Sequence, residues 1–297
     1  DVIKNSIQKL DERFTKGDGL LGVTTGIKYL DELTSGLVDT DFIVIGARPS
    51  TGKTALGINL AESFMMNSED TVVIFTAEMP QDLIMQRFLS SVSGVPARRI
   101  KTGRLHDEDW GLLLSAVEKI KNKNVIIDDS STLTPDYINS ILQKFEIEKG
   151  KVGMVVVDYL QLMTVPNFSQ GKRLEITEIS HALKAVTKSF NCPVVALSQC
   201  TREVDKRPDK RPTKADLMEA GAIEADADII ITLYADEVHN PDTEMKGVLE
   251  VIVCKNRNGE LGTVKTFFDR KIQKIKKELA DLKENREGIY AKWRLEK

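Results

Sequence analysis

The chain has 297 residues, of which 41% are hydrophobic and 29% charged, so it can bury a core and is not a disordered polymer. Lys and Arg total 42 and Asp and Glu total 45, and the net charge of −3 excludes a uniformly basic coat for nucleic acid. No apolar run reaches the roughly 18 residues of a transmembrane helix, and the first residues lack a secretory signal. Three cysteines without C-x-x-C spacing favour a reducing compartment. Because the chain does not begin with methionine, we expect it to be a piece of a longer protein.

The first predicted element is an amphipathic helix over residues 1–16. Its apolar residues recur at helical spacing, and they are Ile3, Ile7, Leu10 and Phe14. The glycines in 17–19 end the pattern. A single helix of this length is only marginally stable in water, so we expect its apolar face to pack on this domain or on a neighbouring chain.

From about residue 20 to residue 268, short apolar runs alternate with helical segments. The predicted strands are 42–45, 71–75, 125–127, 154–157, 194–197, 229–233, 248–253 and 264–267. Continuous runs of Val and Ile indicate strands covered on both faces, as in a parallel sheet between helices. The last two runs have a short connection, which predicts an antiparallel hairpin at the sheet edge. The predicted fold is therefore α/β and mostly parallel, with one domain over residues 20–270.

Residues 271–297 are predicted to form a helical tail of unknown role. Apolar residues mark one face of a Lys- and Glu-rich helix, and they are Ile272, Ile275, Leu279, Leu282, Ile289 and Trp293. A helix that binds a partner, a helix folded back on the domain and a frayed tail are all compatible with this pattern.

The most specific motif lies between a predicted strand and a predicted helix. Residues 47–54 match G-x-x-x-x-G-K-[ST], with alanine at the first position. Backbone N–H groups of such a loop, with the N-terminus of the following helix, bind phosphate oxygens. We expect a nucleotide to be held by Ala47, Arg48, Pro49, Ser50, Thr51, Gly52, Lys53, Thr54 and Ala55. In this role Lys53 neutralises charge on the β- and γ-phosphates of ATP, and the Thr54 hydroxyl binds Mg²⁺.

Three polar residues follow other strands of the same sheet. Asp158 ends the run 154–157, where a parallel strand delivers its side chain to the ligand crevice, and it is predicted to be the carboxylate on the Mg²⁺ side. Glu78 and Gln199 also follow strands. We expect Glu78 to polarise the attacking water and Gln199 to bond to the γ-phosphate or that water. Glu78 and Gln199, taken alone, are equally compatible with ordinary polar residues that leave a strand, whereas the phosphate loop in the same sheet disfavours that interpretation for Asp158.

Motifs in order along residues 22–268 resemble those of bacterial and phage replicative DNA helicases of the DnaB type. They are 22–31, 47–54, 77–80, 157–161, 197–199, 216–224, 226–228 and 255–259. The resemblance implies a RecA-like P-loop NTPase fold, a hexameric ring, and ATP-driven 5′-to-3′ translocation on single-stranded DNA. It also implies that Glu78 is the catalytic base, that Arg87 contacts the γ-phosphate, and that Gln199 senses it.

The resemblance extends to partners and location. It implies a homo-oligomer in the cytoplasm of a bacterial cell or a phage-infected host, with a helicase loader and primase as further partners and no membrane contact. Residues 1–19 resemble the linker helix that packs on the adjacent subunit. The helical domain through which the family meets primase is expected to lie outside this chain.

Lys255 and Arg257 lie two residues apart at a predicted strand end, so their side chains point to the same face. A subunit already has Lys53 for its own phosphates, and a guanidinium from a neighbouring subunit stabilises charge on the transferred phosphoryl group. The resemblance assigns this role to the pair, which would reach the neighbour's ATP. A solvated basic hairpin is the alternative.

Two polar, basic segments, 166–173 and 201–214, follow strands at the same edge of the sheet. In a ring they would line the hole and concentrate positive charge on it. Residues 219–221 resemble the family's turn that holds DNA phosphates by backbone N–H groups, with Met218 where the family often has arginine. The predicted DNA contacts are Lys172, Arg173, Arg202, Glu219, Ala220 and Gly221. Ordinary solvated surface is the alternative for both segments.

Two other functions share part of these features. A RecA-like recombinase or regulatory ATPase shares the phosphate loop and Asp158 but forms filaments or switches partners. A nucleotide-gated scaffold binds ATP without DNA-stimulated turnover. The hydrolytic residues Glu78, Gln199 and Arg257 favour an enzyme that couples ATP hydrolysis to DNA unwinding, which is the function we predict.

Overall fold

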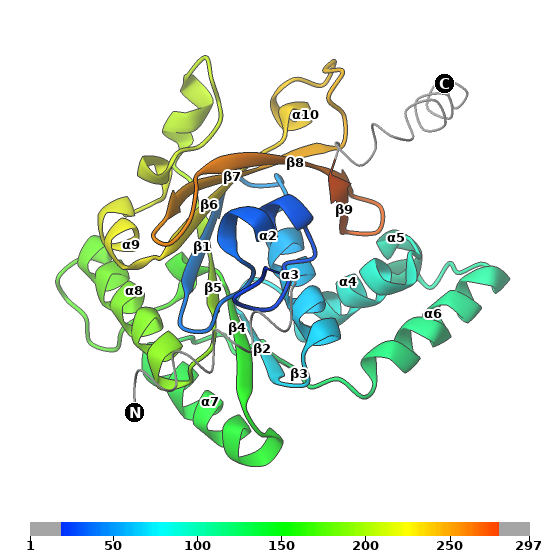
Figure 1. The fold of residues 1–297 in the computed structure, drawn as a ribbon, viewed down its shortest axis with the longest axis horizontal. Helices are drawn as coiled ribbons and strands as arrows, with labels where there is room; N and C mark the ends of the chain where they lie inside the picture. The colour runs from blue at the N-terminus through cyan, green and yellow to red at the C-terminus, as the bar shows by residue number, and fades with distance from the viewer. Residues whose placement is uncertain (1–18, 279–297) are drawn as a thin grey trace.

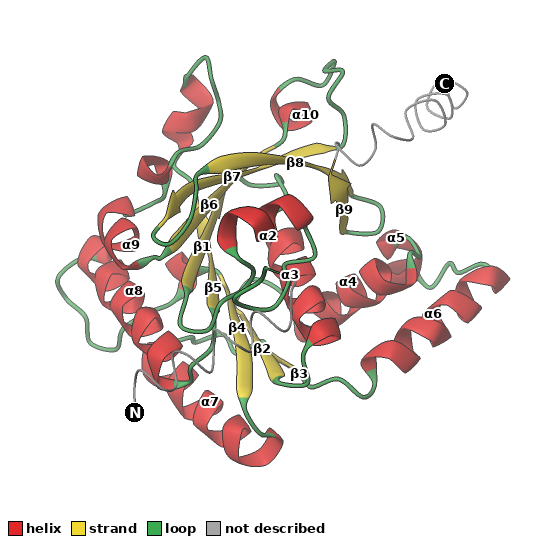
Figure 2. Cartoon of the chain, in the orientation of Figure 1, coloured by secondary structure: helices red, strands yellow, loops and turns green. Residues whose placement is uncertain are grey.

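In the computed structural model, which describes residues 19–278, the apolar runs form a mixed sheet with helices on both faces (Figures 1 and 2). The strands are β1 (Phe42–Ala47), β2 (Thr71–Thr76), β3 (Val125–Asp128), β4 (Val152–Asp158), β5 (Val194–Gln199), β6 (Ile229–Tyr234), β7 (Val248–Asn256), β8 (Gly262–Asp269) and β9 (Lys274–Glu278). The helices are α2 (Lys28–Thr34), α3 (Lys53–Asn67), α4 (Gln81–Ser93), α5 (Ala97–Thr102), α6 (Asp107–Ile120), α7 (Pro135–Lys149), α8 (Lys172–Ser189), α9 (Ala220–Asp226) and α10 (Asp236–His239). Three short 3-10 helices are η1 (Leu160–Leu162), η2 (Arg202–Lys206) and η3 (Lys214–Asp216).

The order of strands across the sheet is β3-β2-β4-β5-β1-β6-β7-β8-β9. Strands β1 to β6 pair in parallel, and β7, β8 and β9 extend the sheet antiparallel. Each of the predicted strands is present, so the mostly parallel α/β fold is confirmed. The predicted hairpin of β7 and β8 is also present, although β9 and not this hairpin forms the edge.

Alternate residues of the central strands face opposite layers of helices. On β1, Ile43 and Ile45 belong to the core beneath α2, α3 and α4. Phe42 and Val44 face the other way, into the core beneath α7, α8 and α9. Both faces of the strand are therefore buried, which explains why β1 and its neighbours are continuous apolar runs without polar alternation.

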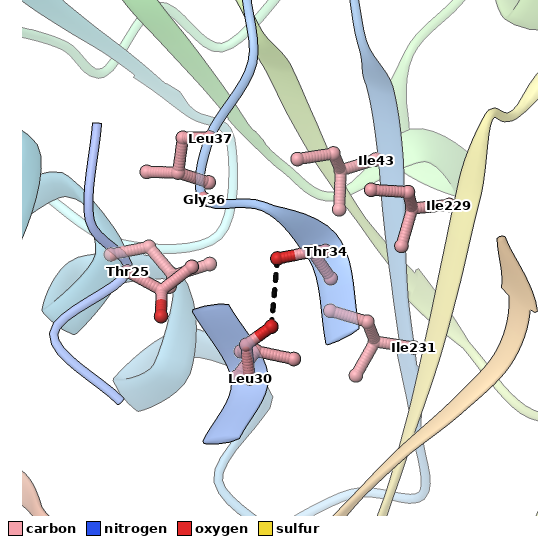
Figure 3. A pocket seen from close by; sticks show the side chains of 9 residues that line it. Thr25, Leu30, Thr34, Gly36, Leu37, Ile43, Ile229 and Ile231 are labelled. Carbon is pink, nitrogen blue, oxygen red and sulfur yellow. Dashed lines mark hydrogen bonds between the residues drawn. The ribbon is translucent and has the colours of Figure 1, made fainter. Parts of the chain in front are cut away.

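The antiparallel strands curve over α2 and α3 and close one end of the first layer (Figure 1). Beneath α2 lies an apolar void of about 10 Å³, between Leu30, Thr34 and Ile43 among others (Figure 3). The Thr34 hydroxyl donates a hydrogen bond of 2.9 Å to the Leu30 carbonyl, and the Thr25 hydroxyl donates one of 2.6 Å to Asp31, so both hydroxyls of the lining are already bonded. The void has room for about one water molecule, so it is a packing gap.

The prediction of a helix from residue 271 onward is wrong for residues 274–278, which form β9. Ile275 is 6% exposed and its N–H donates to the Asn59 side chain, while Lys274 and Lys276 on either side of it form ion pairs. Ile275 is the one apolar residue of β9, and its pairing with Phe268 of β8 therefore decides this segment.

Two other predictions fall outside the described residues, namely the helix over 1–16 and the tail beyond 278. The assignment of residues 1–19 to a linker thus stays a prediction. Within residues 19–278, no helix is both long enough and apolar enough to cross a membrane.

Candidate functional site

The carboxyl ends of the parallel strands bring the predicted nucleotide residues to one edge of the sheet. In the register of β1 with β5, Ala47 lies opposite Gln199, and in that of β2 with β4, Thr76 lies opposite Asp158. The phosphate loop thus begins beside Gln199. Asp158 ends a neighbouring strand at the same edge, which is where α/β sheets bind ligands.

The phosphate loop connects β1 to α3 in the conformation that its glycine allows. Gly52 has φ 120°, a value that side chains rarely tolerate, and it directly precedes the first residue of α3, Lys53. A Cβ atom on Gly52 would also lie 3.0 Å from the Phe268 ring of β8. Space and backbone geometry therefore both require glycine here, and the loop presents the N-terminus of α3 to a ligand.

Thr54 and Asp158 meet where a metal ion would be needed. The Thr54 hydroxyl donates to Asp158 Oδ2 over 2.9 Å, and Lys53 Nζ lies 3.8 Å from Asp158 Oδ1. Asp158 is 2% exposed, and its Oδ1 accepts no hydrogen bond from the described residues. A buried carboxylate oxygen without a donor is costly unless a cation satisfies it. The pair therefore fits Mg²⁺ bound to nucleotide.

Among residues 19–278 there is no cluster of three or more His, Cys, Asp or Glu side chains that could hold a metal by themselves. Mg²⁺ does not need such a cluster, because it is commonly held by one or two protein ligands together with substrate phosphates and water. The Thr54 hydroxyl and the Asp158 carboxylate are a donor set of that kind.

Two cations at the site, Lys53 and Arg87, are partly buried. Burial lowers the pKa of Lys53, and the carboxylates of Asp158 and Glu78 oppose this effect. Burial likewise lowers the pKa of Arg87 on α4, again against the same two carboxylates. Lys53 Nζ also lies 4.1 Å from the centre of the Tyr159 ring. Because Asp158 and Glu78 act on both cations, the predicted residues Lys53, Glu78 and Arg87 share one electrostatic environment, in which an anionic ligand would stabilise both partly buried charges.

Sequence reasoning missed Gln161 as a site residue. Its side-chain amide donates to the Ser198 hydroxyl over 2.8 Å, and its oxygen accepts from the Gln199 N–H over 3.3 Å. Gln161 therefore fixes the end of β5 that carries the predicted sensor Gln199. The available signal was its position three residues after Asp158, on the 3-10 turn η1.

Arg270 is a second residue that the sequence did not reveal. It donates to the Ser50 carbonyl of the phosphate loop over 2.9 Å and pairs with Glu237. Because 220 residues separate Arg270 from Ser50, no local pattern could indicate this contact.

Lys255 and Arg257 lie beside the amino-terminal end of β1, whereas the phosphate loop follows its carboxyl end. Ile43 at the start of β1 pairs with Ile229, and Ile229 pairs with Asn256 of β7, next to both cations. The pair is therefore placed a strand's length from Lys53 of its own chain. This placement agrees with a role toward a neighbouring subunit.

Both cations bond to the last turn of α9 in their own chain. Lys255 Nζ donates to the Glu224 and Ala227 carbonyls over 2.5 and 2.6 Å. Arg257 donates to the Ala225 carbonyl over 2.5 Å and pairs with Asp228 at 3.1 Å. Lys255 is thus half-buried against α9, while the Arg257 side chain stays exposed to 46%.

The predicted DNA contacts gather near the phosphate-loop edge. The Met218 N–H donates to the Gln199 carbonyl over 3.0 Å, which places Glu219, Ala220 and Gly221 beside the end of β5. Glu219 has φ 60° and occupies the N-cap position of α9 without a side-chain hydrogen bond to the helix.

The basic side chains of the predicted DNA segments differ in their partners. Arg173 and Arg202 are exposed. Lys172, in contrast, pairs with Glu175 at 2.8 Å and donates to the Met163 carbonyl.

The basic segment 201–214 is more structured than its sequence suggested. It contains η2, and the Val204 side chain is fully buried. Most of its cations are paired with acids, in the pairs Lys206–Glu203, Arg207–Asp216, Arg211–Glu250 and Lys214–Glu224. These ion pairs remove much of the positive charge that we expected to face DNA and leave Arg202 as the exposed cation at its start.

Comparisons with known proteins show which family model and which relatives match this chain. The family model described as DnaB-like helicase C terminal domain matches residues 22–277. The replicative DNA helicase DnaB of Haemophilus influenzae is 44% identical over 291 residues, covering 97% of this chain and 62% of the relative. The replicative DNA helicase DnaB of Buchnera aphidicola subsp. Acyrthosiphon pisum is 43% identical over 270 residues, covering 90% and 59%. The chain thus spans about three fifths of the length of these relatives.

Solved structures show the same fold. One of them, described as an ATPase domain, superimposes with a TM-score of 0.85 at 34% identity, covering 92% of this chain and 97% of that one. A DnaB-like replicative helicase, described together with its interactions with primase, gives a TM-score of 0.84 at 34% identity. It covers 92% of this chain and 66% of that one.

Proposed function

Because the chain belongs to the DnaB-like helicase C terminal domain family, we propose that it is the motor of an ATP-dependent replicative DNA helicase. It hydrolyses ATP at the subunit interfaces of a hexameric ring, moves 5′ to 3′ on single-stranded DNA and unwinds the duplex at the replication fork. The observation that carries this proposal is the buried Asp158 oxygen without a hydrogen bond, set beside Thr54 and Lys53 at the strand ends.

Each residue of the pocket has a distinct role in this proposal. The backbone of residues 47–55 and the N-terminus of α3 bind the phosphates. Thr54 and Asp158 hold Mg²⁺, which neutralises charge on the β- and γ-phosphates when bound. Lys53 and Arg87 stabilise the charge on the transferred phosphoryl group.

The attacking water is handled by two further side chains. Glu78 is exposed after β2, and its charge acts on both Lys53 and Arg87. It orients the water and accepts its proton. Gln199, held in place by Gln161, contacts the γ-phosphate and registers its loss.

Lys255 and Arg257 complete the pocket of the adjacent subunit. Their position at the far edge of the sheet supports a role in trans, because they cannot serve Lys53's own pocket across the length of the strands. A guanidinium at the γ-phosphate stabilises the charge that develops in the transition state. Turnover therefore requires assembly, which couples the nucleotide state to the arrangement of subunits.

Single-stranded DNA binds to the residues that follow β4 and β5. The exposed Arg173 and Arg202 contact phosphates, and the turn at Glu219, Ala220 and Gly221 contributes backbone N–H groups. Lys172 contributes once it exchanges Glu175 for a phosphate. Such contacts hold the backbone without reading bases, as a motor on any sequence requires.

We further propose a cytoplasmic location in a bacterial cell or a phage-infected host, with a helicase loader and primase as partners. The family membership supports this assignment. The primase-binding segment would lie outside this chain.

Steady-state ATPase rates with and without single-stranded DNA test the function directly. We expect DNA to stimulate wild-type turnover, and we expect Lys53→Ala and Arg257→Ala each to be inactive alone. In a random equal mixture of these two variants, about one quarter of the interfaces would combine an intact Lys53 with an intact neighbouring Arg257, so partial activity should return.

Lys265→Ala is the matched control, since it removes an exposed cation from the same β7–β8 hairpin. It should leave the rate unchanged. A mixture as inactive as its components would contradict the assignment in trans. Nucleotide binding without DNA-stimulated turnover in the wild type would instead favour a nucleotide-gated scaffold, and open filaments in electron micrographs would favour a recombinase.

A further inference from the structure

The Arg48 side chain of the phosphate loop is bonded along both edges of its guanidinium. Nε and Nη2 donate to the Asp205 carboxylate over 3.0 and 2.7 Å, and Nη1 donates to the Cys200 carbonyl over 2.9 Å. The Arg48 side chain is 16% exposed. Its planar fork thus fixes the direction as well as the distance of its partners. We call these contacts the Arg48–Asp205 bridge.

The bridge joins the nucleotide edge to a segment that carries a predicted DNA contact. Asp205 lies in η2, the five-residue helix that begins with Arg202. Val204 of the same helix is fully buried, so η2 moves with its surroundings and not as a loose loop. Cys200 directly follows the predicted sensor Gln199. The guanidinium therefore contacts the chain on both sides of Arg202.

The connection continues to the second group of DNA contacts. The Thr201 N–H donates to the Asp216 carbonyl over 2.8 Å, and the Met218 N–H donates to the Gln199 carbonyl over 3.0 Å. These bonds lead to the turn at 219–221. Hydrogen bonds and the short backbone stretches between them thus connect the second residue of the phosphate loop to Arg202 and to the turn at 219–221.

We propose that Arg48 is a positioning residue that couples the state of the phosphate loop to DNA binding through Asp205. The inference rests on the proposed function, and it adds a specific connection between the two sites. A bidentate bridge transmits a displacement of the loop to η2, because neither partner can rotate without losing hydrogen bonds. With nucleotide bound, η2 is held in the orientation that presents Arg202 to DNA.

The matched pair Asp205→Asn and Glu203→Gln isolates the bridge. Both substitutions remove one negative charge from η2. Asp205 pairs with Arg48, whereas the described ion pair of Glu203 is with the exposed Lys206. Fluorescence anisotropy gives the dissociation constant of single-stranded DNA with and without a non-hydrolysable ATP analogue, and steady-state assays give the basal and DNA-stimulated ATPase rates.

For Asp205→Asn we expect a basal ATPase rate close to wild type. The effect of the analogue on DNA affinity, and the stimulation by DNA, should each fall by about fivefold or more, in the usual range of coupling between two sites. Glu203→Gln should match the wild type, and Asp205→Glu, which keeps a carboxylate, should recover most of the stimulation.

Failure of the inference can be told apart from failure of the proposed function. A wild type that DNA does not stimulate would overturn the proposed function, and the inference with it. A stimulated wild type matched by an equally stimulated Asp205→Asn variant would overturn the inference alone. Equal losses of basal and stimulated rates, with a lowered melting temperature, would assign the bridge to structure only and would also overturn it.

Arg48→Lys provides a second variant in case Asp205→Asn does not fold. Lysine keeps the charge but lacks the fork that reaches Asp205 and the Cys200 carbonyl together. The ratio of DNA affinities with and without the analogue should fall as in Asp205→Asn. An unchanged ratio would again overturn the inference.

Discussion

Replacing Asp41 with asparagine is expected to stabilise the fold at neutral pH. Asp41 directly precedes β1 and is 8% exposed. Burial, together with the charge of the nearby Asp228, raises the pKa of its carboxyl to about 6, although Lys184 acts in the opposite direction. Asp228 itself accepts a hydrogen bond from the Phe42 N–H over 2.8 Å and pairs with Lys184 and Arg257, so its carboxylate is fixed in place near Asp41.

The magnitude follows from the difference in pKa between the two states. The ordinary value for the Asp41 carboxyl is 3.8 and the folded value is about 6. Each unit corresponds to about 1.4 kcal/mol, so ionising Asp41 in the folded state costs about 3 kcal/mol as an upper estimate. Because the folded state binds this proton more tightly, the contribution of Asp41 to stability falls as the pH rises from about 4 to about 6.

Asparagine resembles the protonated carboxyl in shape and cannot ionise. The free energy of unfolding of Asp41→Asn should therefore equal that of the wild type near pH 4 and exceed it increasingly up to about pH 6, with a constant gain above. Urea unfolding followed by circular dichroism at pH 4, 5, 6 and 7 measures this difference.

Asp39→Asn removes an exposed carboxylate two residues away and is the control, for which we expect no such gain. A gain for Asp41→Asn that does not change with pH, or a loss of stability at pH 7, would refute the reasoning.

Other expectations concern the phosphate loop, the basic segment and the thiols. Gly52→Ala should lower stability by about 1–3 kcal/mol in urea unfolding and weaken ATP binding, because φ is 120° and the new Cβ would crowd Phe268. Arg211→Ala should cost about 2 kcal/mol in the same assay, since it removes both hydrogen bonds from the buried Glu250 carboxylate. Burial raises the pKa of the Cys200 thiol to about 12, so iodoacetamide at pH 8 should label it in urea and not in the folded protein. The affinity for single-stranded DNA should fall steeply with salt in a titration from low ionic strength, and a flat response would exclude the arginines as phosphate contacts.

The fold was predictable because its strands are local signals. A strand covered on both faces needs an uninterrupted apolar run. A run such as 154–157 therefore indicates a buried strand without any information from the rest of the chain. Strand β9 was missed because its local signal is ambiguous. Ile272 and Ile275 lie three residues apart, a spacing that also suits a helix, and only the pairing of Ile275 with Phe268 decides between the two.

The site was predictable only where its residues are contiguous or follow a strand. The phosphate loop is one uninterrupted segment, and Asp158 ends a strand of the same sheet. The contacts that position these residues join distant parts of the chain instead. Arg48 reaches across 157 residues to Asp205, and Arg270 reaches across 220 residues to Ser50. No spacing rule applies to such pairs, since their proximity is created by the packing of the whole sheet.

Helix α9 connects the two functional edges of the molecule. It begins beside Gln199, where the predicted DNA turn lies, and ends at the carbonyls that hold Lys255 and Arg257. The carboxyl end of a helix carries partial negative charge, which favours a cation there. If the pair moves to a neighbour's nucleotide, as proposed, α9 loses these partners and its last carbonyls turn to water. A triphosphate offers full negative charges where the helix offers partial ones, so nucleotide in the adjacent subunit is the ligand able to draw the pair away.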